Sequence, residues 1–113
     1  MNYTGKKVLI VGMAKSGVSA AKLLYQMGAQ IALYDRKSRE DFAEHKEIMA
    51  LLDRGAVDFL GADPDQGEEW AEILILSPGV PVKQAFIQRA MQNGKKVISE
   101  IELGYEVAKA EFV

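Results

Sequence analysis

The chain has 113 residues, of which 49% are hydrophobic and 27% charged, and these proportions are typical of one compact globular domain. It contains no cysteine, which excludes disulfides, thiolate metal sites and cysteine nucleophiles and favours a reducing compartment. A formal net charge of −2 argues against general binding to nucleic acid or a membrane surface, and no apolar run is long enough for a signal peptide or a membrane span. We therefore expect a single cytoplasmic domain over residues 1–113.

The stretch VLIVGMAKSG, residues 8–17, combines a buried strand with a glycine-containing turn. Its four consecutive apolar residues predict a strand covered on both faces, as in parallel sheets. Gly12 permits a sharp turn, and Gly17 lets the following helix lie close to the sheet. The N–H groups of such a turn favour anions, most often nucleotide phosphates. Ala14 stands where a dinucleotide fingerprint has its second glycine, so a turn that serves structure alone stays open as an alternative.

A helix that ends near Gly28 and a second strand over residues 30–34 follow. The strand ends at Asp35, close to where dinucleotide-binding folds keep the carboxylate that binds ribose. A solvated acid at a strand end is the alternative interpretation of this residue.

Ser38 and Asp41 indicate the start of a charged helix that closes near Gly55. The only histidine lies in this helix and has no visible ligand or catalytic partner, so we expect no function for it. The predicted buried side of the helix consists of Phe42, His45, Met49 and Leu52.

Residues 56–60 predict a third strand, and GADPDQGEEW after it predicts a polar loop with solvated carboxylates and no metal site. Residues 73–76 predict a fourth buried strand. The turn SPGVP, residues 77–81, follows at once, and we expect Gly79 to adopt a positive φ there. A rigid strand-to-helix turn without a ligand is the alternative interpretation.

The next helix ends at residues 93–94, and a fifth strand is predicted over residues 96–98. Ser99 and Glu102 form a capping-box pattern that opens a last helix. The penultimate helix is predicted to bury Phe86, Ile87, Ala90 and Met91. The last helix is predicted to pack on the sheet through Ile101, Tyr105, Ala108 and Phe112. A second apolar line of Leu103, Val107 and Ala110 is predicted to be partly exposed or covered by a neighbouring molecule, and burial of both lines within the domain is the alternative.

Five strands that alternate with helices predict an α/β fold with a doubly wound parallel five-stranded sheet, order 3-2-1-4-5 and helices on both faces, which is Rossmann-like. Ligands of such sheets bind outside the carboxyl ends of the strands, where the strand order reverses. The loops expected to meet there are residues 12–17, 35–37 and 77–81.

The stretches VLIVGMAKSGVSAAKLL, LYDRK, LILSPGVP and VISEIELGYEVAKA together resemble the N-terminal domain of the Mur ligases, most closely the MurD group, over essentially the whole chain. The resemblance implies that this domain binds the UDP part of UDP-N-acetylmuramoyl-L-alanine in a ligase of peptidoglycan synthesis that adds D-glutamate. It also implies that ATP and Mg²⁺ act in central and C-terminal domains that this fragment lacks, so we expect the fragment to bind substrate without catalysis and to hold no cofactor or metal.

The resemblance also implies which residues contact the substrate. The implied positions form a phosphate turn, a uracil-side segment and a loop beside the substrate. They are Gly12, Met13, Ala14, Lys15, Ser16 and Gly17; Asp35, Arg36 and Lys37; and Ser77, Pro78 and Gly79. Ala14 departs from the glycine that is more common in the family. An NAD(P)-binding domain of an oxidoreductase or of a ligand-gated regulator, and an interaction module with a vestigial pocket, remain as alternatives.

Overall fold

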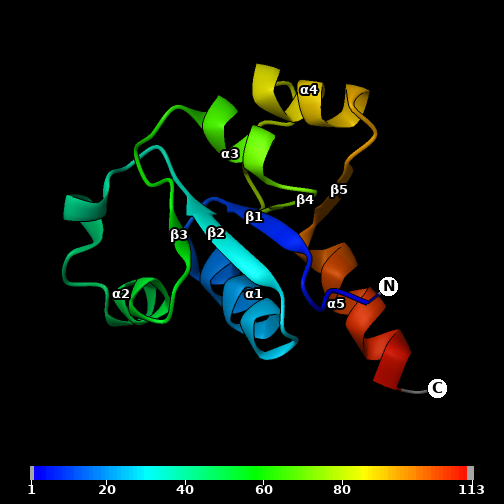
Figure 1. The fold of residues 1–113 in the computed structure, drawn as a ribbon, viewed down its shortest axis with the longest axis horizontal. Coiled ribbons are helices and arrows are strands. Elements are labelled where there is room, and N and C mark those ends of the chain that lie inside the picture. Colours follow the sequence, from blue (N-terminus) through cyan, green and yellow to red (C-terminus); the bar gives the residue numbers. More distant parts are fainter. Residues whose placement is uncertain (1, 112–113) are drawn as a thin grey trace.

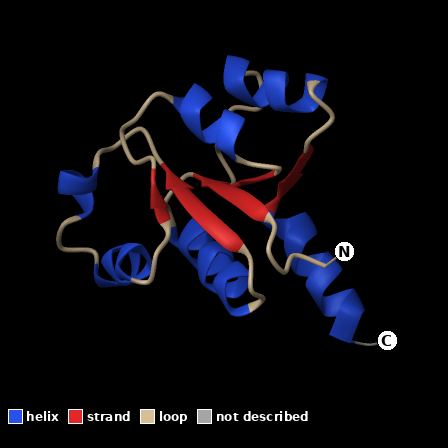
Figure 2. Cartoon of the chain, viewed as in Figure 1, coloured by secondary structure: helices blue, strands red, loops and turns tan. Residues whose placement is uncertain are grey.

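The computed structural model describes residues 2–111 of the chain, with side chains as far as residue 109, as three layers in which helices cover both faces of one sheet (Figure 1 and Figure 2). The strands are all parallel and run in the order β3-β2-β1-β4-β5, which confirms the predicted fold. Their bounds are β1 Lys7–Val11, β2 Gln30–Tyr34, β3 Val57–Asp58, β4 Ile73–Leu76 and β5 Lys96–Ser99.

The helices divide between the two faces of the sheet (Figure 1). Helices α1, α2 and α5 lie on one face, and α3 and α4 lie on the other. Successive side chains of β1 pack on opposite faces of the sheet. Val8 and Ile10 belong to the core on the α1 side, whereas Leu9 and Val11 belong to the core on the α4 side. The bounds are α1 Lys15–Gln26, a 3-10 helix η1 Arg39–Phe42, α2 Lys46–Asp53, α3 Pro64–Trp70, α4 Ala85–Gln92 and α5 Glu100–Glu111.

The predicted charged helix is in fact two elements. Ser38 and Asp41 form the expected capping box, but it opens only η1. His45 caps α2 through its side chain, whose Nδ1 accepts the Ile48 N–H at 3.3 Å, and it is exposed. The fully buried residues of α2 are Ile48 and Leu51, which the prediction missed. Of the predicted stripe, Phe42 and Leu52 are half-buried and pack against the core, whereas His45 is exposed because it caps the helix.

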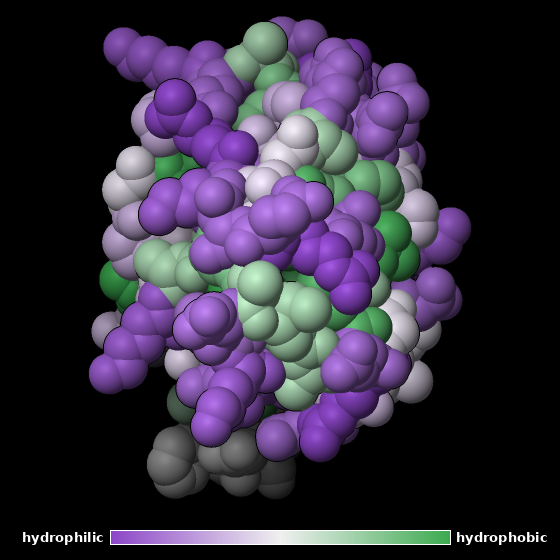
Figure 3. Space-filling model, turned by 90° about the vertical axis from the view of Figure 1, so that its left-hand side faces the viewer, coloured by the Kyte–Doolittle hydropathy of each residue, from purple (hydrophilic) through white to green (hydrophobic). Residues whose placement is uncertain are grey.

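The third strand, Val57–Asp58, is shorter than predicted, and Asp58 Oδ1 accepts the Leu60 N–H at 2.9 Å in a turn directly after it. The Phe59 N–H still donates to the Leu33 carbonyl of β2 at 3.0 Å. This edge of the molecule, where β3 and α2 lie, has a largely hydrophilic surface with smaller hydrophobic areas (Figure 3).

The polar loop predicted after β3 contains α3 instead. Asp63 caps this helix by accepting the Asp65 N–H at 3.0 Å, and Pro64 occupies its first turn. Glu68 was predicted to be solvated, but it is 1% exposed. Its carboxylate pairs with Arg89 at 3.0 Å and Lys95 at 3.3 Å, which joins α3 to α4 and to the turn before β5.

The two last helices pack through fewer residues than predicted. On α4, Phe86, Ile87 and Ala90 are buried as expected, whereas Met91 is 41% exposed. On α5 the expected capping box is present, with the Glu102 N–H donating to Ser99 Oγ at 3.1 Å.

The stripe of α5 that was expected to face the sheet is exposed, at 61% for Ile101 and 72% for Tyr105. Leu103 and Val107 pack on the core in its place, because α5 lies beside β5 and presents only this narrow side to the sheet. The two apolar lines thus have exchanged roles: the line that was predicted to be partly exposed is buried at Leu103, and the stripe that was predicted to be buried is exposed. Phe112 and the side chain of Ala110 lie outside the described residues.

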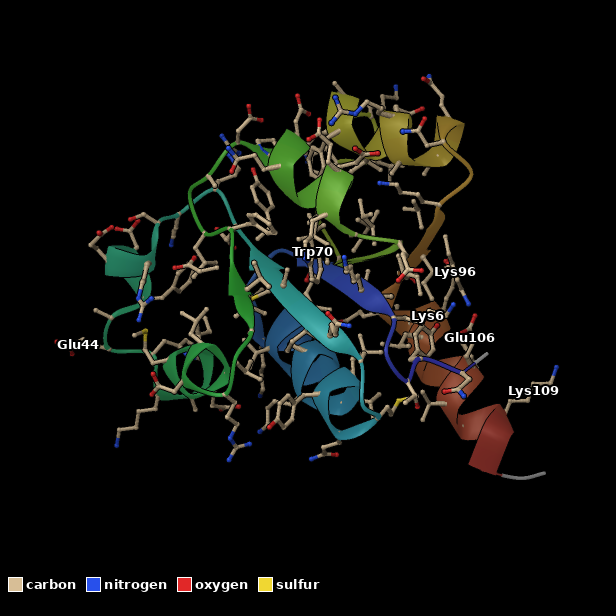
Figure 4. The ribbon with its side chains drawn as sticks, viewed as in Figure 1. Lys6, Glu44, Trp70, Lys96, Glu106 and Lys109 are labelled. Atoms are coloured by element: carbon tan, nitrogen blue, oxygen red, sulfur yellow. The ribbon has the colours of Figure 1, made fainter. Side chains whose placement is uncertain are left out.

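The beginning of the chain contacts α5 (Figure 1). Tyr3 is buried, and its hydroxyl donates to Glu106 Oε2 at 2.5 Å. Lys96 Nζ donates to the other oxygen of Glu106 at 2.6 Å, and Figure 4 shows the two side chains next to each other. This cluster ties the first residues, β5 and α5 together.

Candidate functional site

The turn after β1 has the tight geometry that its glycines predict. Gly12 has φ +95°, and its N–H donates to the Tyr34 carbonyl at 2.8 Å. A Cβ added to Gly17 would lie 1.9 Å from the Gly12 carbonyl oxygen, so only glycine fits where α1 approaches the turn. This close packing of helix on strand confirms the structural part of the interpretation of VLIVGMAKSG.

Side chains from the two neighbouring strands hold the same turn. Asp35 Oδ2 accepts the Met13 N–H at 2.7 Å, and Asp35 Oδ1 accepts the Lys37 N–H at 2.9 Å. From the other side, Ser77 Oγ donates to the Gly12 carbonyl at 2.9 Å. The loops after β1, β2 and β4 therefore meet at one place, as expected from the strand order.

The N-terminus of α1 opens beside this turn with unsatisfied donors. Its cap residue, Ala14, offers no side-chain hydrogen bond, and the first turn contains no acidic residue. The Val18 N–H donates to the Ala14 carbonyl at 3.1 Å, so the three N–H groups before it have no partner within the helix. Ala14 has φ −71° and is exposed, so the backbone here does not require glycine. Such an end attracts negatively charged groups.

A cavity of about 510 Å³ lies at the carboxyl ends of β1 and β2. Its walls are apolar at Val80 and Pro81 and polar at Asp35 and Arg36. The full lining is Val11, Gly12, Tyr34, Asp35, Arg36, Gly79, Val80, Pro81 and Gln84.

Four of the twelve residues predicted for the site line this cavity, namely Gly12, Asp35, Arg36 and Gly79. Ala14, Lys15 and Lys37 are exposed and do not line it, Ser16 lines a second hollow between α1 and α5, and Pro78 lies in a groove toward β5. Met13, Gly17 and Ser77 are buried. Gly79 has φ +88°, which confirms the expectation for this turn.

Five of the nine lining residues were not predicted as contact positions, namely Val11, Tyr34, Val80, Pro81 and Gln84. Pro81 closes the SPGVP motif, and Gln84 is the cap residue of α4, so both followed from their places in the loop. Tyr34 is the last residue of β2. Because successive side chains of a strand point to opposite faces of the sheet, the sequence could have placed Tyr34 on the α4 side once Leu33 was placed on the α1 side.

The charges around the cavity favour an anion. Among the described residues, Lys15, Arg36 and Lys37 form no ion pair within the protein. Burial, and secondarily the charge of Asp35, raise the pKa of the Tyr34 phenol above its ordinary value, so this wall of the cavity stays neutral at physiological pH.

Among residues 2–109, whose side chains the structure describes, no group of three or more histidine, aspartate or glutamate side chains is arranged to hold a metal ion. None of the helices within residues 2–111 is both long and apolar enough to cross a membrane.

Comparison with known proteins gives close relatives across almost the whole chain. The UDP-N-acetylmuramoylalanine–D-glutamate ligase of Enterococcus hirae is 40% identical over 109 residues, which are 96% of this chain and 23% of the relative. Proteins of the same name from Geobacillus sp. (strain WCH70) and Listeria monocytogenes are 36% and 37% identical over 98% of this chain. The chain thus spans about a quarter of the length of the curated relatives that it matches.

Solved structures share the fold at low identity. The D-lactate dehydrogenase of Escherichia coli aligns with a TM-score of 0.61 and 18% identity over 88% of this chain and 29% of the other. A pseudomurein peptide ligase type C from Methanothermus fervidus gives a TM-score of 0.61 and 16% identity over 88% of this chain and 20% of the other. These likenesses show the Rossmann-like fold and nothing more specific.

A family comparison matches residues 6–99 and thereby covers every loop that meets at the cavity. Together with relatives of 34–40% identity, it supports the resemblance seen in the sequence. The chain belongs to the family of Mur ligase MurD-like N-terminal domains.

Proposed function

We propose that this chain is the N-terminal domain of a cytoplasmic UDP-N-acetylmuramoyl-L-alanine:D-glutamate ligase and that it binds the UDP part of the nucleotide-sugar substrate. One observation carries the proposal. In a chain of this family, Gly12 of the turn that leads into α1, a cation from the loop after β2 and the Gly79 loop all border one cavity.

Each part of the site suits a part of a nucleoside diphosphate. The diphosphate binds at the N-terminus of α1, where backbone N–H groups are donors. Arg36 offers a two-pronged phosphate contact, and Lys15 and Lys37 add positive charge. The base enters the cavity between the apolar wall at Val80 and Pro81 and the end of β2.

The chemistry of the full-length protein belongs to domains beyond this one. The relatives are about four times as long, and this chain contains no G-x-x-x-x-G-K-[ST] phosphate loop. We propose that ATP and Mg²⁺ bind in those other domains, where the alanyl carboxylate of the substrate is phosphorylated and then attacked by the amine of D-glutamate. In this proposal no catalytic residue lies in residues 1–113.

Calorimetric titration of the 113-residue chain with UDP, UDP-N-acetylmuramoyl-L-alanine, NAD and NADP tests this function. We expect heat of binding with both uridine nucleotides and none with the dinucleotides. Arg36→Glu should abolish the binding of UDP, whereas Arg54→Glu, which reverses an exposed charge outside the lining of this cavity, should leave it unchanged. Binding of NAD or NADP in preference to UDP would support an oxidoreductase domain, and binding of none of the four would refute a nucleotide site.

A further inference from the structure

The Asp35 carboxylate connects two of the loops at the cavity, and its backbone carbonyl holds a third loop nearby. Asp35 Oδ2 accepts the Met13 N–H from the turn after β1, and Oδ1 accepts the Lys37 N–H from the segment after β2. The Asp35 carbonyl accepts the Gly61 N–H at 2.9 Å from the loop after β3. The position of Asp35 therefore fixes the turn and the cationic segment relative to each other.

Ser77 holds the opposite side of the same turn. Its side chain is buried, its Oγ donates to the Gly12 carbonyl at 2.9 Å, and its N–H donates to the Val11 carbonyl at 3.1 Å. The Gly12 carbonyl also abuts Gly17 of α1. This oxygen is thus held against Ser77 and α1, and the turn is bonded to both neighbouring strand ends.

We propose that Asp35 and Ser77 are positioning residues, which hold the phosphate turn and the Arg36-Lys37 segment in the arrangement that binds a nucleoside diphosphate; this rests on the function proposed above. The sign of the electrostatics makes the idea testable. A carboxylate beside an anion site repels the ligand, so its removal strengthens binding if charge alone matters. Its removal weakens binding if the carboxylate acts by holding the backbone.

Substitutions at Asp35 separate these two effects in a titration with UDP. Asp35→Asn removes the charge and turns an NH₂ group toward one of the two N–H donors, so the dissociation constant should rise about tenfold, as for the loss of a charge-assisted hydrogen bond. The matched control is Asp58→Asn, since Asp58 makes the same contact two residues ahead, to the Leu60 N–H, but does not line the cavity. The control should bind UDP as the wild type does. Unchanged or tighter binding by Asp35→Asn would overturn the proposal.

A double-mutant cycle tests whether Asp35 acts through the cationic segment. Lys37→Ala should weaken UDP binding in the wild type and have a clearly smaller effect in the Asp35→Ala background, because that background no longer holds residue 37 at the site. Equal effects in the two backgrounds would show that the residues act independently and would contradict the proposal.

A measurement without ligand distinguishes this inference from the proposed function. The Met13 N–H should be protected from hydrogen exchange in the wild type and should exchange about tenfold faster in Asp35→Asn, while the Leu9 N–H in β1 is unaffected. Ser77→Ala should weaken UDP binding and Ser77→Thr should restore it, since threonine keeps the hydroxyl donor. If UDP does not bind to the wild type, the proposed function fails, and the Met13 exchange rates alone decide whether Asp35 holds the turn. Equal exchange in wild type and Asp35→Asn would refute that role.

Discussion

Two groups of charged side chains in this domain differ in whether partners within the protein compensate their charge. Around Glu68, a buried carboxylate is surrounded by Arg89, Lys95 and Asn93, so its charge is compensated within the protein. The two rim cations, Arg36 in the lining of the cavity and the adjacent Lys37, are exposed and form no ion pair among the described residues.

The difference separates stabilising charges from charges available to a ligand. A buried carboxylate that loses its partners strongly destabilises a fold, whereas an exposed cation contributes little to stability and is available to bind an anion. Substitutions in the Glu68 cluster should therefore change stability without changing nucleotide affinity, and substitutions at the rim should do the reverse.

Glu68→Ala should have the largest effect on stability. It leaves Arg89 and Lys95 without their shared partner, and we expect the free energy of unfolding to fall by about 3 kcal/mol. Denaturant unfolding measures the loss. The control is Glu69→Ala, because Glu69 is exposed and its carboxylate lies as far as 3.9 Å from the Arg89 guanidinium. This substitution should lower the free energy of unfolding by less than about 0.5 kcal/mol. Similar losses for both variants would contradict the distinction.

The stability of the wild type should decline in acid partly through the same residue. Burial by itself raises the pKa of Glu68, but hydrogen bonds from Asn93, Lys95 and Arg89 hold this pKa below its usual value. The resulting stabilisation is present above the pKa of an unfolded glutamate, about 4.3, and is lost as the pH falls through the lower pKa of the folded state. Unfolding measured between pH 7 and pH 3 should show a shallower decline for Glu68→Gln than for the wild type. Parallel curves would mean that Glu68 does not contribute to the acid sensitivity.

Gly79→Val should affect the cavity through backbone conformation. A Cβ at this position meets no atom within 4 Å, so the cost arises from φ +88° alone, about 1–2 kcal/mol for a non-glycine residue. We expect the loop to shift and UDP affinity to fall about fivefold to tenfold, measured by titration. Gly94→Val is a close control, because Gly94 has φ +75° and open space but lies at the end of α4, away from the cavity. It should lose stability and keep its affinity for UDP.

The smallest effects are expected at the exposed cations. Arg36→Ala and Lys37→Ala should each weaken UDP binding by about 1 kcal/mol at low salt, with thermal stability unchanged. The losses should shrink at high salt because screening weakens the same interaction. Arg54→Ala serves as the control. Unchanged affinity in both rim variants at low ionic strength would remove this segment from the site.

The sheet was predictable because its central strands are apolar on both faces. The runs at residues 8–11 and 73–76 are fully buried, as expected. Gly28, Gly79 and Gly94 have positive φ at the ends of elements or in turns, also as expected. The strand order then followed from the alternation of strands and helices.

Elements that depend on contacts distant in the sequence were not predictable. The stretch at residues 61–70 looked solvated because the partners that bury Glu68 lie more than twenty residues later. Even so, Asp63 followed by Pro64 is a helix start that local reasoning could have used. On α5, two apolar stripes were visible, and only the position of the helix beside β5 decides which of them is buried.

The candidate site also has features that the sequence predicted and features that it did not. The loops that converge were predictable from the topology, and the two glycine conformations at Gly12 and Gly79 followed from the motifs. The hydrogen bonds of Asp35 and Ser77 to the turn were not, because they depend on the distance between neighbouring strand ends. The assignment of the twelve residues to a bound nucleotide stays a prediction.

The contact between Tyr3 and Glu106 joins residues that are far apart in the sequence and that the ribosome therefore adds at different times. Tyr3 belongs to the core beside β1, yet its hydroxyl obtains its carboxylate partner only after 103 further residues have been added. During translation the domain can form its central strands early, but this seam closes last, when α5 emerges and docks. A nascent chain stalled before Glu106 should therefore expose Tyr3 to chemical labelling, and a chain stalled well beyond it should protect Tyr3.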